Sequence, residues 1–177
     1  MSPAQKTDFN IDPELIGWRE IVALPELDIH TVRAKIDTGA RTSALHAVDE
    51  ETFVHDGVNW VSFSVPGVRH LRRRRAEAPL LDERNVKNTS GVAEWRRVIR
   101  TALVIGRHRW EIDLSLANRA NMEFELILGR TALHARNVFV APNHSYLLGS
   151  PNPSRARRYS LPALTTGELL NQGEEEE

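Results

Sequence analysis

Hydrophobic and polar residues alternate along several short stretches of the chain, and a period of two is typical of half-buried β-strands. The alternation is clearest over residues 31–36, 95–105 and 110–116. Glycine- and proline-containing turns separate these stretches, and the best helical candidate is the short segment 131–136. We therefore predict an all-β domain, a barrel or a sandwich of closely spaced strands.

Turn residues locate most of the remaining strands. We expect strands over residues 17–24, 27–36, 44–49, 124–128 and 138–140. Asp56-Gly57 between two apolar stretches predicts a hairpin with a type I′ turn, because both residues tolerate positive φ. The polar segment 68–90, interrupted by Pro79, is expected to form short strands and loops.

Composition describes an ordinary globular protein of 177 residues with 41% hydrophobic and 27% charged residues. We expect a flexible leader over residues 1–16, one domain over 17–149 and a flexible tail over 150–177. No stretch is long and apolar enough to span a membrane, and the N-terminus has no secretory pattern. The sequence has no cysteine, which fits a reducing compartment, and we expect a cytoplasmic protein.

Charge is distributed unevenly. The chain ends in four glutamates, Glu174 to Glu177, so the formal net charge of -1 conceals a basic body. Arg72 to Arg75 form an unbroken basic run. A basic body suggests an anionic partner or substrate, although a solvated face or a nucleic-acid patch are alternatives for the run.

The strand at residues 31–36 leads into Asp37-Thr38-Gly39-Ala40. Alternation places Arg33, Lys35 and Asp37 on one face, and His30 with the apolar residues on the other. Gly39 allows a tight turn, so Asp37 is a carboxylate held at a strand end. An Asx-turn that merely ends the strand is the alternative interpretation.

A second motif, Leu126 to Arg130, follows later in the chain and precedes the expected helix. Together with Asp37-Thr38-Gly39 it resembles retropepsin-like aspartic peptidases. The stretches AKIDTGARTSALHA, GVAEWRRVIRTALVIG, MEFELILGRTAL and SYLLG resemble one bacterial family, the RimB-type glutamate-specific endopeptidases, also described as ATP-dependent zinc proteases. The resemblance implies a closed retropepsin-like barrel, an acid-protease half-barrel, with one short C-terminal helix.

Catalysis in this family would use Asp37. Two such carboxylates share a proton, so that one activates water while the other polarises the scissile carbonyl. The sequence has one such turn, and we therefore expect a homodimer in which two Asp37 side chains face each other. The resemblance implies that Thr38, Gly39, Ala40 and Gly129 support this site.

The resemblance also implies a substrate: poly-glutamate chains on the tail of a small-subunit ribosomal protein, added by a partner ATP-grasp ligase and trimmed by this endopeptidase. Arg41, Lys35, Arg72 and Arg73 are the expected substrate-binding residues, because guanidinium and ammonium groups pair with carboxylates. A structural ion pair is the alternative for Arg41. The tail glutamates could also enter the site, or could serve only as a solubilising end.

No cofactor and no metal are expected. The sequence contains neither a phosphate-binding loop nor a His-Glu-x-x-His motif, and its seven histidines are scattered. Asp37, His46 and His134 could converge on zinc, but no spacing requires it. Two alternative functions remain: a non-catalytic domain that binds an acidic tail or RNA through its arginines, and a zinc-dependent peptidase.

Overall fold

The computed structural model describes residues 14–67, 73–87, 91, 93–134, 138–155 and 157–158. These residues form a β-rich chain with one short α-helix and one 3-10 turn, Pro25–Leu27. The strands are β1 (Glu14–Gly17), β2 (Arg19–Leu24), β3 (Ile29–Ile36), β4 (Ser43–His46), β5 (Val48–His55), β6 (Val58–Val65), β7 (Arg74–Lys87), β8 (Ala93–Ile105), β9 (His108–Ala117), β10 (Leu126–Leu128), β11 (Val138–Ala141) and β12 (Arg157–Arg158); the helix is α1 (Arg130–Leu133).

Six strands close into a barrel. They follow the order β9-β4-β10-β3-β2-β8, and β8 pairs again with β9 to complete the ring. Apolar side chains from alternate positions fill the interior, among them Ile36, Leu103, Leu114 and Leu126, which are almost fully buried. The expected all-β class, the closed retropepsin-like barrel and the short helix are thus confirmed.

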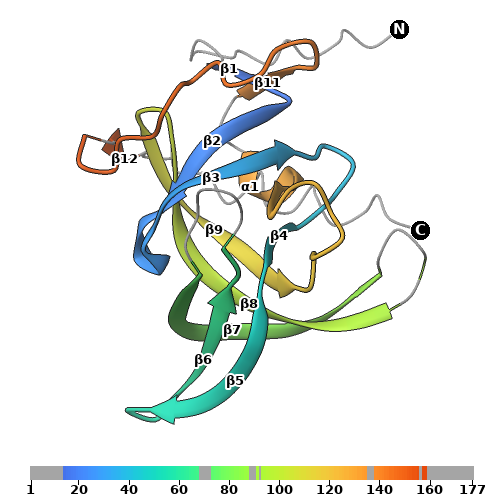
Figure 1. Cartoon of the computed structure of the whole chain (residues 1–177), viewed down its shortest axis with the longest axis vertical. Coiled ribbons are helices and arrows are strands. Elements are labelled where there is room, and N and C mark those ends of the chain that lie inside the picture. Colours follow the sequence, from blue (N-terminus) through green and yellow to red (C-terminus); the bar gives the residue numbers. More distant parts are fainter. Residues whose placement is uncertain are drawn as a thin grey trace, which may run out of the picture.

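Two long hairpins extend the sheet beyond the barrel. Strands β5 and β6 form the first, and it projects away from the barrel body (Figure 1). Asp56 and Gly57 at its tip have φ angles of 50° and 75°, as the predicted type I′ turn requires. Strands β7 and β8 form the second.

The prediction of short strands and loops over residues 68–90 is wrong within the described part, because Arg74–Lys87 is a single strand of 14 residues. Strand β7 pairs with β6 as far as Pro79, then with β8 from Leu80, with a bulge before Asp82. Proline donates no backbone hydrogen bond and therefore suits the point where the partner changes. Most side chains on β7 are exposed, so the strand carries little of the alternation that reveals strands.

His30 does not share the buried face of β3 as expected. Ile29 and Val32 are buried, whereas His30 and Thr31 are exposed. The pairing of β2 with β3 shifts between Val22 and Leu24, and such a bulge reverses the side-chain alternation on one side of it. From Val32 onward the predicted alternation is confirmed.

The helix begins at Arg130, one residue before the predicted start, and its described part ends at Leu133. Residues 135 and 136 of the predicted helix lie outside the described residues. Strand β1 includes residues 14–16 of the expected leader and pairs with β11, and β12 lies in the expected tail and pairs with β9. The domain boundaries themselves stay predictions.

Candidate functional site

The Asp37 turn is fixed by the backbone around it. Asp37 follows β3 directly, and its N–H donates a hydrogen bond of 2.9 Å to the carbonyl of Leu128 on β10. The carboxylate accepts a 3.2 Å bond from the Ala40 N–H through Oδ1, while Lys35 Nζ lies 3.3 Å from Oδ2. The side chain remains 28% exposed, so Asp37 is a held carboxylate that solvent and ligands can reach.

Gly129 closes the other side of this corner. A Cβ at Gly129 would lie 2.6 Å from the carbonyl carbon and oxygen of Thr42, so only glycine allows this approach. The Gly129 N–H donates to Ser43 Oγ at 3.1 Å, and the Arg130 N–H donates to the Ala40 carbonyl at 2.9 Å. The start of α1 is thus attached to the Asp37 turn by the main chain.

The Arg130 side chain caps the turn from the helix. Its guanidinium donates to the carbonyls of Thr38 and Gly39 at 3.1 and 3.3 Å. Both Thr38 and Gly39 are exposed, so the apex of the turn faces solvent. The structure therefore brings together the predicted supporting residues Thr38, Gly39, Ala40 and Gly129 around Asp37, although their roles stay predictions.

Strand β10 lies between β3 and β4, parallel to β3 and antiparallel to β4. Lys35 pairs with Ile127, and the same register continued by two residues brings Glu125 beside Arg33. We call the side of these strands that points away from the barrel core the outer face, defined by Asp37, Lys35, Arg33, Ile127 and Glu125. These five side chains are all partly buried.

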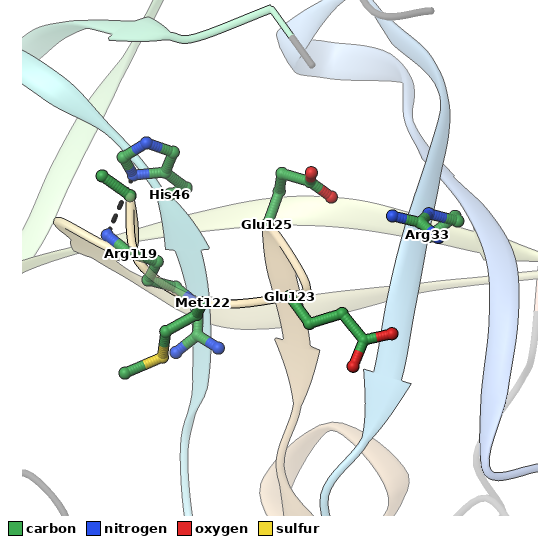
Figure 2. A pocket seen from close by; sticks show the side chains of 7 residues that line it. Arg33, His46, Arg119, Met122, Glu123 and Glu125 are labelled. Carbon is green, nitrogen blue, oxygen red and sulfur yellow. Dashed lines mark hydrogen bonds between the residues drawn. The ribbon is translucent and has the colours of Figure 1, made fainter. Parts of the chain in front are cut away.

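A pocket of about 430 Å³ lies at the Arg33 and Glu125 end of the outer face (Figure 2). In that view Arg33 stands on one side, His46 and Arg119 on the other, and the Glu123 and Glu125 side chains lie between them. The lining residues are Arg33, His46, Arg119, Ala120, Met122, Glu123 and Glu125. The volume is within the range of small-molecule sites.

Arg119 is built into the pocket wall. Its Nε donates to the carbonyl of Phe124 at 3.2 Å, and its main-chain N–H donates to His46 Nδ1 at 3.0 Å. The tautomer that accepts this bond carries its ring proton on Nε2. Burial lowers the pKa of Arg119 and nearby Arg96 adds to this, while Asp37 and Glu125 oppose it. Asp37 and the pocket thus share one electrostatic environment.

The predicted substrate-binding residues separate into two groups. Lys35 and Arg41 lie at the Asp37 turn: Lys35 contacts the carboxylate, and the Arg41 carbonyl accepts a 3.0 Å bond from Thr131 Oγ1. Arg73 lies elsewhere, before β7, and forms an ion pair with Asp49 on β5. Arg72 lies outside the described residues.

Within the described ranges, no group of three His, Asp or Glu side chains could hold a metal ion. This applies to the zinc alternative from Asp37, His46 and His134, and the Nδ1 of His46 is already engaged by Arg119. Likewise, no helix in the described part of the chain is long and apolar enough to cross a membrane.

Sequence reasoning missed five pocket residues: Arg119, Ala120, Met122, Glu123 and Glu125. One signal was present, because Glu125 is a charged residue inside the otherwise apolar stretch 124–128. A charge within a predicted strand indicates a side chain on the solvent-facing side of the sheet. The other four belong to an irregular loop after β9, where no period predicts side-chain direction.

The sequence matches the RimB-like family, described as the retropepsin-like aspartic endopeptidase RimB, over residues 15–151. A solved structure of a Legionella pneumophila protein of unknown function is similar, with a TM-score of 0.65 and 25% identity, covering 76% of this chain and 98% of that one.

Curated relatives carry a different name. A probable α-L-glutamate ligase of Desulfotalea psychrophila is 44% identical over 131 residues, covering 73% of this chain and 28% of the relative. Proteins of the same name from Shewanella halifaxensis and Parasynechococcus marenigrum are 38% and 42% identical, covering 78% and 76% of this chain and 30% and 29% of each relative. The chain thus spans under a third of the curated relatives that it matches.

These names overturn one expectation. The function expected from the sequence, an endopeptidase that trims poly-glutamylated protein tails, is wrong, because relatives 37–44% identical are named for joining glutamate rather than for cleaving peptide bonds. The family description supports the retropepsin-like class, and the relatives' names fit the expected link to a glutamate ligase.

Proposed function

The chain belongs to the RimB-like family of retropepsin-like proteins, and on that premise we propose that it is an accessory domain of α-L-glutamate ligation. One observation carries the proposal. Several curated relatives include a matching unit of 131–140 residues within much longer proteins named as probable α-L-glutamate ligases. An accessory domain would work beside the ligating part of such a protein.

Charge on the outer face supports this role. Ligation of glutamate uses an anionic amino acid and gives an anionic product, so a domain that holds either one needs accessible cations. Lys35 and Arg33 project from the partly buried outer face, and Arg41 is exposed beside it. The Asp37 turn would position Lys35 through their 3.3 Å contact.

The ligating activity would come from a separate ATP-grasp ligase or from a fused domain. The partner and this chain would share the glutamate-bearing acceptor, bound along the outer face. A complex with the acceptor would depend on ionic strength, because salt weakens attraction between exposed charges.

A ligation assay tests the proposal. The rate at which the ligase adds labelled L-glutamate to an acceptor peptide is measured with and without this chain. We expect a higher rate with the chain and a loss of the gain with Lys35→Gln, whereas Arg75→Gln on the β7 hairpin should keep it. An unchanged rate at saturating chain would contradict the proposal.

Aspartic-type hydrolysis of a peptide bond is a second candidate, favoured specifically by the exposed Asp37-Thr38-Gly39 turn. It requires a homodimer, since one carboxylate must be protonated while the other is ionised. Incubating the chain with a mixed peptide pool, followed by mass spectrometry for new termini, tests it. Cleavage that disappears in Asp37→Asn would support hydrolysis, and sedimentation of a monomer without cleavage would contradict it.

A further inference from the structure

The pocket at the end of the outer face contains charged side chains that form no close ion pair with one another or with the rest of the described chain. Among the described residues, neither Glu123 nor Glu125 has an ion-pair partner, and Arg33 contacts only the face of the Phe124 ring, at 5.6 Å. Arg119 uses its Nε in a bond to a carbonyl, while its terminal nitrogens have no carboxylate partner in the same ranges.

The arginines on the long hairpins are in a different state. Arginines on the long hairpins meet carboxylates at close range: Arg75 pairs with Glu51 at 2.8 Å, Arg96 with Glu94 at 2.9 Å and Arg97 with Glu50 at 3.0 Å. Two cations and two anions that share one pocket without pairing are held apart by the strands and the loop that carry them. Arg33, Arg119 and Glu125 are partly buried. Partly buried charges without a close partner favour a ligand that supplies one.

The order of charges across the pocket specifies the ligand. Arg33 on β3 and Arg119 after β9 lie on opposite sides, with Glu125 between them (Figure 2). A complementary molecule has two anionic groups flanking one cation. An α-amino dicarboxylic acid has this pattern, because it bears two carboxylates and an ammonium group. A pocket of about 430 Å³ holds such a molecule together with bridging waters.

We propose that this pocket binds free L-glutamate as a zwitterion. The two carboxylates bind Arg33 and Arg119, and the ammonium group binds Glu125. The inference deepens the proposed function, on which it rests, by naming the small molecule that the accessory domain holds for ligation. Arg33 lies four positions before Asp37, about 13 Å along an extended strand, so the contact with Arg33 is distinct from the Asp37 turn.

Calorimetric titration of the whole chain with L-glutamate tests the proposal, carried to tens of millimolar so that an affinity on the order of 1 mM reaches saturation. Glutarate, which lacks the ammonium group, and 4-aminobutyrate, which lacks the α-carboxylate, serve as matched ligands. We expect saturable binding of L-glutamate and affinities about tenfold weaker for each analogue, the scale of one lost charge-assisted contact.

Variants connect each contact to its residue. Arg33→Gln and Glu125→Gln should each weaken L-glutamate binding about tenfold, and Glu125→Gln should remove the advantage of L-glutamate over glutarate. Arg75→Gln and Glu51→Gln are the matched controls, because they break an exposed pair of the same residue types away from the pocket. They should leave the affinity within about twofold. Circular dichroism confirms the fold of every variant.

Three results would overturn the inference: no saturable binding, glutarate binding as tightly as L-glutamate, or equal losses in the pocket and control variants. Tighter binding of an N-acetylated acidic peptide than of L-glutamate would also overturn it, since the pocket would then hold a peptide. The ligation assay separates this inference from the proposed function. If the chain stimulates the ligase but does not bind glutamate, only the proposed glutamate binding in the pocket is refuted. If the chain binds glutamate but does not stimulate the ligase, only the accessory role is refuted.

Discussion

The two arginine-bearing regions of the molecule differ in how their charges are satisfied. On the long hairpins, Arg73, Arg74 and Arg75 each form an ion pair with a carboxylate from another segment. On the outer face, Arg33 and Arg119 share a pocket with two glutamates and pair with neither within the described chain. The sequence draws attention to the first region, because its arginines are consecutive.

The comparison shows that density of charge along the sequence does not locate a site. Consecutive residues on a strand point to opposite faces, so a basic run spreads over two surfaces and finds local acids on each. Isolated charges that β3 and the segment between β9 and β10 bring to one pocket stay available for a ligand. The variants described below test how the outer face and the long hairpins differ.

The largest expected effect comes from the corner that supports the outer face. Gly129→Ala should lower the free energy of unfolding by about 3 kcal/mol, because the new Cβ would lie 2.6 Å from the Thr42 main chain. Thermal unfolding followed by circular dichroism measures this loss.

Gly39→Ala is the matched control, since its added Cβ would meet only the Asp37 carboxylate, at 3.4 Å. It should unfold close to the wild-type temperature. Equal losses in the two variants would show that Gly129 does not hold the corner through this close approach.

The next effect concerns a carboxylate that is fully buried. Glu20 on β2 accepts main-chain N–H bonds from Gly17 at 2.7 Å, Leu147 at 3.0 Å and Leu148 at 3.3 Å. Glu20→Gln replaces one acceptor oxygen by a donor and should cost about 1–3 kcal/mol of unfolding free energy. Denaturant titration should show it, with Glu51→Gln on the exposed hairpin as a nearly neutral control.

Breaking a hairpin pair should have a smaller effect. Arg75→Gln removes the 2.8 Å contact with Glu51, and both side chains are largely exposed. We expect a loss under about 1 kcal/mol that shrinks further in high salt. Denaturant titrations at two salt concentrations measure the loss of unfolding free energy. A loss above about 1 kcal/mol that does not change with salt would contradict the view that the hairpin ion pairs are weak surface contacts.

The smallest effect is a dependence on pH. Hydrogen bonds from the Arg84 side chain and the Glu83 N–H hold the pKa of Asp82 below its usual value. A lowered folded-state pKa stabilises the fold above the unfolded value of about 3.9, and the gain is lost as pH falls through the folded value. Asp82→Asn should therefore unfold slightly earlier than wild type at neutral pH and match it in strong acid. A difference that grows in acid would contradict this sign.

Much of the fold could be predicted from the sequence because its barrel strands have one buried face. Residues 95–105 and 110–116 alternate for that reason. The turn at Asp56-Gly57 could be predicted because both residue types tolerate positive φ. Strand β7 escaped prediction because its buried residues, Ala76 and Ala78, are small and few, and most of its other side chains are exposed. The bulge that exposes His30 escaped because a shift in pairing leaves no local signal.

The residues of the candidate site also divide into those that the sequence predicted and those that it did not. Asp37, Lys35 and Arg33 were assigned to one face by the period of β3 alone, and Gly129 by its motif. Arg119 and Glu123 could not be placed, because they belong to an irregular loop whose direction depends on contacts such as the Arg119 bond to Phe124. That the charged side chains of the pocket form no close ion pairs can be recognised only from the structure.

Chemical-shift mapping of the isotopically labelled chain during titration with L-glutamate tests the central claim most directly, namely that the outer face rather than the arginine run is the functional surface. We expect saturable shifts at Arg33, His46 and Glu125, and none at Arg73 or Arg75. Shifts confined to Arg73 and Arg75, or no shifts at all, would contradict it.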